Sequence, residues 1–177
     1  DSIWILEHVH FNKNSTIADV GTGPVSPGIP LIIMRPDLKM TLIDSNNKKI
    51  QFLNLVKKEL SLEVTIENGR AEIYAKANQN TFNYIVSRAV SSLRELVEIN
   101  IPMLKSKGHF FAYKSQKHED EVLEAKRTLL TLSSRIQTLY KKELPEQAGE
   151  RIVLDIVKQK HIQGFPRTYQ QIKKKGL

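Results

Sequence analysis

Two glycines and one acid carry the first chemistry that the sequence suggests. Gly21 and Gly23 follow a short apolar run that ends in an acid, within "DVGTGPVSPG" at residues 19–28. Asp44 lies 23 residues after Gly21, at the end of a second apolar run. Glycines let a backbone approach a ligand and adopt positive φ, and an acid at about this spacing accepts hydrogen bonds from a ribose diol. The combination predicts a site for a nucleoside-containing cofactor.

The residues after Gly23 bear on which cofactor the loop holds. A dinucleotide loop has a third glycine, which lets a helix N-terminus close on the pyrophosphate. Here Val25 and Pro27 follow instead, and no P-loop lysine motif is present. S-adenosylmethionine, which carries no phosphate, is therefore the favoured cofactor. A dinucleotide site and a structural turn that binds nothing remain open from these residues alone.

Two later segments are expected at the same edge of the sheet. Ala71 and Glu72, in "NGRAEI", follow a third apolar run, where backbone groups meet the edge of an adenine; a turn that opens a helix is the alternative. Arg88, in "SRAV", ends a fourth run and needs either an anion or water. Its candidate anions are a methionine carboxylate, a substrate phosphate or a local carboxylate such as Glu72.

Hydrophobic periodicity predicts the elements that must position these residues. Strands are expected at 15–21, 39–44, 62–69, 82–90, 108–114, 135–144 and 150–158, and helices at 3–11, 28–36, 46–60, 93–104 and 118–132. Ser45 is the expected N-cap of the helix at 46–60. Strands alternating with helices predict an α/β fold with an open, mostly parallel sheet covered on both faces. The last two strands predict an antiparallel hairpin.

Composition excludes several classes of site. The chain has 177 residues, which suits one domain. The sequence has no cysteine, which excludes disulfides and cysteine-ligated zinc. No apolar run approaches the roughly 20 residues that a membrane span needs, and the five histidines show no metal-ligand spacing. We therefore expect no membrane and no metal.

Positive charge is concentrated at the C-terminal end. The net charge is +8, and residues 158–177 hold six basic residues and no acid. Such a block predicts a polyanionic partner, most often nucleic acid, although a solvated tail is the alternative. We expect one domain over residues 1–157 and a basic tail over 158–177, packed on that domain or extending from it.

Several motifs together resemble a known family. "DVGTGPVSPGIPLIIMRPDLKMTLIDSNNKKIQFL", "GRAE", "SRAV", "GERIVLDIVKQ" and a "PR…KKKGL" ending resemble, in order, the RsmG (GidB) family of bacterial 16S rRNA methyltransferases. The resemblance implies a Rossmann-like class I fold with a seven-stranded sheet, S-adenosylmethionine as cofactor, and methylation of guanine N7 in the 530 loop of 16S rRNA. It also implies a cytoplasmic monomer whose partner is 16S rRNA or a precursor of the small ribosomal subunit. The family has a helical region before the point where this chain begins, so we expect that region to be missing.

The glycine loop, the basic segment and the resemblance together indicate roles for individual residues. The cofactor-binding set comprises Gly21, Gly23, Ser26, Asp44, Ala71, Glu72 and Arg88. The expected RNA-binding set comprises Lys114, Arg151, Arg167, Lys173, Lys174 and Lys175. Phe165, Arg167 and Tyr169 are candidates to stack on an unpaired base, with ordinary packing as the alternative.

The implied reaction needs no general base. Guanine N7 has an in-plane lone pair and no proton, so we expect no catalytic acid or base and a rate governed by positioning. Two other functions stay open. The first is a methyltransferase for a small molecule or a protein. The second is an RNA-binding protein with weakened cofactor binding, because Val25 and Ser26 replace residues usual in the family loop.

Overall fold

The computed structural model describes residues 2–23, 26–88, 91–114, 118–143, 149–174 and 176–177. It contains seven strands in one sheet: β1 (Thr16–Val20), β2 (Lys39–Asp44), β3 (Val64–Asn68), β4 (Phe82–Arg88), β5 (Leu104–Lys114), β6 (Ser134–Glu143) and β7 (Glu150–Lys158). The helices are η1 (Trp4–Glu7), α1 (Gly28–Met34), α2 (Asn47–Glu59), α3 (Ala71–Ala77), α4 (Leu93–Asn100), η2 (Ile101–Met103), α5 (His118–Thr131) and α6 (Tyr169–Lys174).

The strand order is β3-β2-β1-β4-β5-β7-β6. Strands β1 to β5 pair in parallel, whereas β7 runs antiparallel to both β5 and β6. This confirms the expected α/β sheet with an antiparallel final hairpin. The chain first builds outward from β1 to β3 and then returns to place β4 on the other side of β1. The topological switch point therefore lies between β1 and β4.

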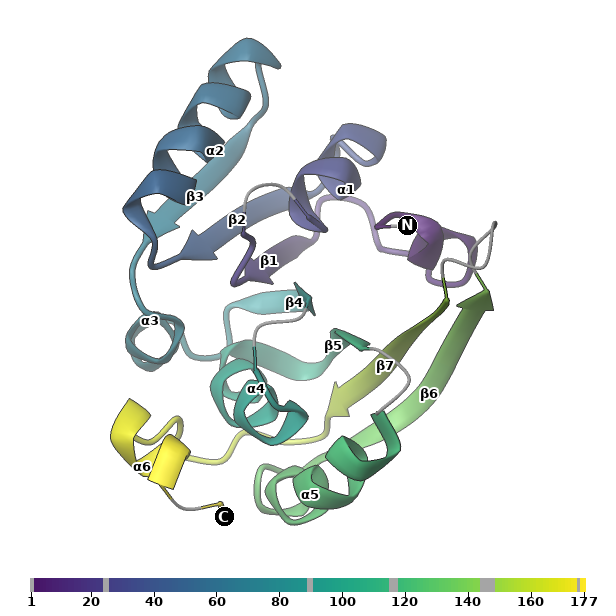
Figure 1. Cartoon of the computed structure of the whole chain (residues 1–177), viewed down its shortest axis with the longest axis vertical. Coiled ribbons are helices and arrows are strands. Elements are labelled where there is room, and N and C mark those ends of the chain that lie inside the picture. The colour runs from purple at the N-terminus through teal and green to yellow at the C-terminus, as the bar shows by residue number, and fades with distance from the viewer. Residues whose placement is uncertain (1, 24–25, 89–90, 115–117, 144–148, 175) are drawn as a thin grey trace.

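Helices cover both faces of the sheet (Figure 1). One core contains side chains from α3, α4 and α5, such as Ala75, Leu96 and Leu129, and the other contains side chains from α1 and α2, such as Leu31 and Leu53. The central strands are buried on both faces, which accounts for the near-continuous apolar runs in their sequences. Helix α6 lies beside α3 and α4 in Figure 1.

Several predicted boundaries were wrong. Only η1 is helical in the segment expected to be a helix at 3–11. Asn46, not Ser45, caps α2, because its side chain accepts hydrogen bonds from the amides of Lys48 and Lys49. The helix expected to reach residue 104 ends at Asn100: Pro102, which has no amide hydrogen, lies in η2, and Leu104 already belongs to β5.

The C-terminal segment also differs from a simple tail. Strand β7 extends to Lys158, one residue past the expected domain boundary, and that lysine is 1% exposed. Its ammonium donates to the carbonyls of Pro102 and Leu104 and to the Asn80 side chain. Burial lowers the pKa of Lys158 to about 8. Lys158 therefore anchors the end of the sheet, although sequence reasoning counted it among the tail cations.

Candidate functional site

A cavity of about 690 Å³ opens at the carboxyl ends of the central strands. This is the edge at which open α/β sheets bind ligands, beside the switch point. All seven residues predicted to bind the cofactor line the cavity: Gly21, Gly23, Ser26, Asp44, Ala71, Glu72 and Arg88. The fold thus brings four separate segments, at the carboxyl ends of β1, β2, β3 and β4, to one site.

The loop after β1 is held by Asp19, a residue to which sequence reasoning gave no role. Its Oδ2 atom accepts hydrogen bonds from the Thr22 hydroxyl and the Gly28 amide, both at 2.7 Å. A Cβ atom on Gly28 would lie 2.7 Å from the same oxygen, so only glycine permits this approach. Asp19 therefore joins the two ends of the loop. The one feature of the sequence that could have indicated this role is the position of Asp19 as an acid near the end of an apolar strand.

The Asp19 carboxyl is fully buried, and burial raises its pKa to about 7. The hydrogen bonds from Thr22 and Gly28 oppose that shift, whereas the nearby charge of Asp44 adds to it. Its other oxygen, Oδ1, has no hydrogen-bond partner among the described residues.

Asp44 ends β2 and fixes two neighbouring segments. Its Oδ2 accepts a hydrogen bond from the Gly23 amide at 3.0 Å, and its Oδ1 accepts one from the Asn46 amide at 2.9 Å. Lys49 approaches Oδ2 at 3.6 Å. An ionised carboxylate has about four acceptor positions, so these contacts leave capacity for a ligand. Gly21 and Gly23 adopt φ values of 71° and 61°, which glycine adopts without strain.

The segment after β3 supplies another wall. The Arg70 guanidinium pairs with the buried Glu72 carboxylate, with Nε and Oε1 2.6 Å apart. The lining beside them is apolar and comprises Ile43, Ala71, Leu96, Ile99 and Ile172. This combination offers a flat apolar ring both a surface and nearby backbone groups.

Arg88, the last residue of β4, joins the loop from the other side. Its Nη1 donates to the hydroxyl of Ser26 at 3.1 Å and to that of Ser2 at 3.4 Å. Ser26 therefore ties the loop to β4. Val25, the other unusual residue of the loop, lies outside the described residues.

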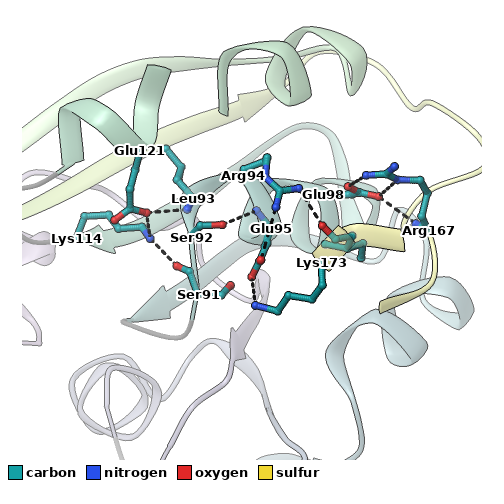
Figure 2. A network of polar contacts seen from close by, with 11 residues as sticks. Ser91, Ser92, Leu93, Arg94, Glu95, Glu98, Lys114, Glu121, Arg167 and Lys173 are labelled. Atoms are coloured by element: carbon teal, nitrogen blue, oxygen red, sulfur yellow. Dashed lines mark hydrogen bonds and ion pairs between the residues drawn. The ribbon is translucent and has the colours of Figure 1, made fainter. Parts of the chain in front are cut away.

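Three of the basic residues predicted to bind RNA, Lys114, Arg167 and Lys173, pair with acids of the fold, as Figure 2 shows. The Lys114 ammonium, whose side chain is 5% exposed, pairs with Glu121 at 2.6 Å and donates to the Ser91 carbonyl at 2.8 Å. Arg167 forms a two-point contact with Glu98, at 2.7 and 2.8 Å. These cations already have partners within the fold. Their predicted RNA contacts would use the N–H donors that these partners leave free.

Lys173 and the remaining basic residues differ in their surroundings. Lys173 pairs with Glu95 at 2.7 Å and lines the cavity, whereas the neighbouring Lys174 is exposed. Arg151 is half-buried near the start of β7. Lys175 lies outside the described residues. Several other lining residues were not predicted from the sequence, among them Lys49, Arg70 and Glu95, and Tyr169, predicted only as a residue that stacks on RNA, also lines the cavity. They follow no simple spacing because their elements meet only in the folded chain.

The part of the chain that the structure describes contains neither a candidate metal centre nor a candidate membrane span. No group of three or more His, Cys, Asp or Glu side chains there is placed to hold a metal ion. No helix of these residues is both long enough and apolar enough to span a bilayer.

Comparison with solved structures places the fold among methyltransferases. M. jannaschii TYW2 in complex with AdoMet superposes with a TM-score of 0.67 at 16% identity, covering 85% of this chain and 71% of that one. A predicted O-methyltransferase from Agrobacterium tumefaciens gives a TM-score of 0.68 at 13% identity, covering 97% and 94%. At such identities the likeness concerns the fold.

Sequence comparison is more specific. A family model described as GidB, rRNA small subunit methyltransferase G, matches residues 1–149. A protein of that name from Acholeplasma laidlawii is 39% identical over all 177 residues, which cover 77% of its length. Another from Staphylococcus haemolyticus is 41% identical over 170 residues, covering 94% of this chain and 71% of the relative.

Proposed function

Because the chain belongs to the rRNA small subunit methyltransferase G (GidB) family, we propose that it methylates N7 of a guanine in the 530 loop of 16S rRNA. It is an S-adenosylmethionine-dependent methyltransferase of class I fold. The observation that carries the proposal is the convergence of all seven predicted cofactor residues on one cavity.

The residues of the cavity fit S-adenosylmethionine part by part. Asp44 retains acceptor positions for ribose hydroxyls, because its present bonds use only part of its capacity. The apolar lining beside Ala71 suits adenine, and Arg88 is the cationic group that would face the methionine carboxylate. Gly21 and Gly23 leave the backbone open on the ligand side, since neither carries a side chain.

When bound, the cofactor would supply an electrophilic methyl group on its sulfonium, whose carbon the in-plane lone pair of guanine N7 can attack while the S–CH3 bond breaks and the neutral thioether leaves. The protein then has to hold the guanine in line, exclude water and accept no proton, because N7 carries none. Positioning of this kind is worth several powers of ten in rate. The loop pinned by Asp19 and the contact between Arg88 and Ser26 would provide the rigidity that positioning needs.

The RNA side of the proposal rests on charge and on accessibility. Guanine N7 faces the major groove, which is deep and narrow in A-form RNA, so the target must be an unstacked loop base. We propose that the exposed cations of residues 158–177, with Lys174 foremost, contact phosphates near that base. Arg151 would do so from β7, while Lys114, Arg167 and Lys173 would contribute through the capacity that their acidic partners leave.

We also propose the biological setting that such a substrate implies. The partner would be 16S rRNA or a precursor of the small subunit, the enzyme would act as a monomer, and the reaction would occur in the cytoplasm. Residues 1–157 would form the catalytic unit, and the following segment would complete it.

Methyl transfer from labelled S-adenosylmethionine tests the proposal. Naked 16S rRNA, small-subunit particles lacking the modification and an unrelated RNA are incubated with the protein, and the modified base is located by N7-specific strand cleavage. Label confined to one guanine of the 530 loop supports the proposal. Label on a small molecule or a protein would replace it with another methyltransferase activity. RNA binding without cofactor binding would replace it with a binding function.

A further inference from the structure

Helix α6 lines the same cavity as the predicted cofactor residues. Tyr169, Ile172 and Lys173 face it together with the loop after β1 and the ends of β2 and β4. This segment was expected to be a tail for RNA. Its contribution to the cavity is an independent feature, because nothing in the spacing of the glycine and acid motifs involves residues near the C-terminus.

Polar contacts hold α6 against α4, as Figure 2 shows. Arg94 donates to the carbonyl of Ile172 at 2.9 Å, and Lys173 pairs with Glu95 at 2.7 Å. The Glu95 hydrogen bond raises the pKa of Lys173, so the Lys173 ammonium keeps its proton throughout the neutral range. Ile172 is 1% exposed. The helix is therefore anchored on both a buried side chain and charged contacts.

The segment that leads into α6 is also held by contacts with the rest of the protein. Arg167 forms its two-point contact with Glu98, which is fully buried. The side-chain amide of Gln79 donates to the carbonyl of Phe165 at 3.1 Å. Phe165 also packs against the core cluster of α3, α4 and α5. These contacts explain how a segment with mostly polar residues packs against the domain.

Tyr169 lies at the part of the cavity that would hold adenine. Its ring centroid is 4.0 Å from the Arg70 guanidinium carbon, and Arg70 in turn pairs with Glu72. Tyr169 is 41% exposed, so part of the residue remains accessible beside the Arg70 guanidinium. An aromatic face near an apolar lining provides area for a planar base at little cost in side-chain freedom.

We propose that Tyr169 is a binding residue for the adenosyl part of the cofactor and that Lys173, through Glu95, is a positioning residue that holds α6 over the cavity. The inference rests on the proposed use of S-adenosylmethionine. It assigns the C-terminal helix to the cofactor site, in addition to any RNA contact made by its outer face.

Calorimetry on the full chain tests this with two probes, S-adenosylhomocysteine and 5′-methylthioadenosine, which share the adenosyl group. Tyr169→Ala should weaken both about tenfold, whereas Tyr169→Phe should bind nearly as the parent does, because the ring supplies the contact. Gln170→Ala, an exposed change on the same helix and outside the cavity lining, is the control and should change neither affinity.

A second pair of variants tests the positioning role. Lys173→Gln should weaken both probes about threefold, and Lys173→Arg should restore the affinity, since it keeps the pair with Glu95. Lys57→Gln, in the last turn of α2 and outside the cavity lining, is the control that removes the same charge elsewhere and should change neither affinity. Equal probe affinities for the parent chain and Tyr169→Ala would overturn the inference while leaving the proposed function standing. A parent chain that binds neither probe would overturn both.

Discussion

The amide of Gly23 donates a hydrogen bond to the carboxylate of Asp44 over 3.0 Å, joining residues 21 positions apart in the chain. One residue lies in the loop after β1 and the other ends β2, and β1 and β2 pair in parallel. The acid predicted to recognise a ribose therefore also sets the position of the loop predicted to surround it. Ligand recognition and loop geometry share one carboxylate.

The first prediction concerns that shared carboxylate. Asp44→Asn keeps the shape and one acceptor oxygen but removes the charge, so S-adenosylhomocysteine affinity should fall by about tenfold or more, while the free energy of unfolding should change by about 1 kcal/mol. Calorimetry and urea denaturation measure the two effects. Asp120→Asn, in the first turn of α5 and outside the cavity lining, should leave affinity unchanged. Normal affinity in Asp44→Asn would remove the ribose assignment.

The second prediction concerns pH. The Asp19 pKa is raised by burial to about 7, against an ordinary value of 3.8, so the folded state holds the proton more tightly than the unfolded state does. The free energy of unfolding should therefore fall as pH rises from about 4 to about 7, by about 1.4 kcal/mol for each unit of pKa difference. The stabilising contribution of protonated Asp19 is therefore complete near pH 4 and is lost as the pH rises to about 7.

Asp19→Asn isolates this contribution because its amide does not titrate. Urea denaturation of parent and variant at pH 5 and pH 8 should show the parent losing stability relative to the variant at the higher pH. The difference between the two proteins cancels the titration of other groups. A constant difference at both pH values would mean that Asp19 keeps the same charge throughout.

The central strands could be predicted from the sequence because they are buried on both faces and therefore form nearly continuous apolar runs, whereas β6 shows the alternating pattern of a strand with one exposed face. The seven predicted strands all appear, and the order of motifs placed Gly21, Asp44, Ala71 and Arg88 at one edge. That inference needs only the rule that parallel strands share a direction. The predicted boundaries of helices were wrong where a single residue determines the end of the helix, as Asn46 does at the start of α2 and Pro102 does after α4.

The C-terminal residues show where sequence reasoning stops. A lysine in a basic segment predicts exposure, yet Lys158 is buried among carbonyls and Lys173 faces an acid of α4. The partners of these cations lie about 55 to 80 residues earlier in the chain. The composition of a segment gives its net charge, whereas only the folded structure shows which of its cations already have hydrogen-bond or ion-pair partners.

The third prediction separates two roles for Lys114. Its ammonium bridges Glu121 and the Ser91 carbonyl, and Glu121 also accepts the Leu93 amide at the start of α4. Lys114→Met should therefore lower the free energy of unfolding by about 3 kcal/mol, because it leaves a carboxylate without its cation. The double variant with Glu121→Gln should recover part of that loss. Reduced RNA affinity with unchanged stability would instead assign Lys114 to the RNA surface.

The fourth prediction concerns RNA binding by the basic helix. Removing one cation that neutralises a phosphate should reduce the slope of log affinity against log salt by roughly 0.7 to 0.9. Lys174 is exposed, whereas Lys173 is paired with Glu95. Lys174→Gln should therefore flatten the slope by about one such step, and Lys173→Gln should flatten it less. Filter binding of a 530-loop RNA across salt concentrations measures both, with Lys57→Gln, in the last turn of α2, as the control. An unchanged slope in Lys174→Gln would exclude that lysine from the RNA interface.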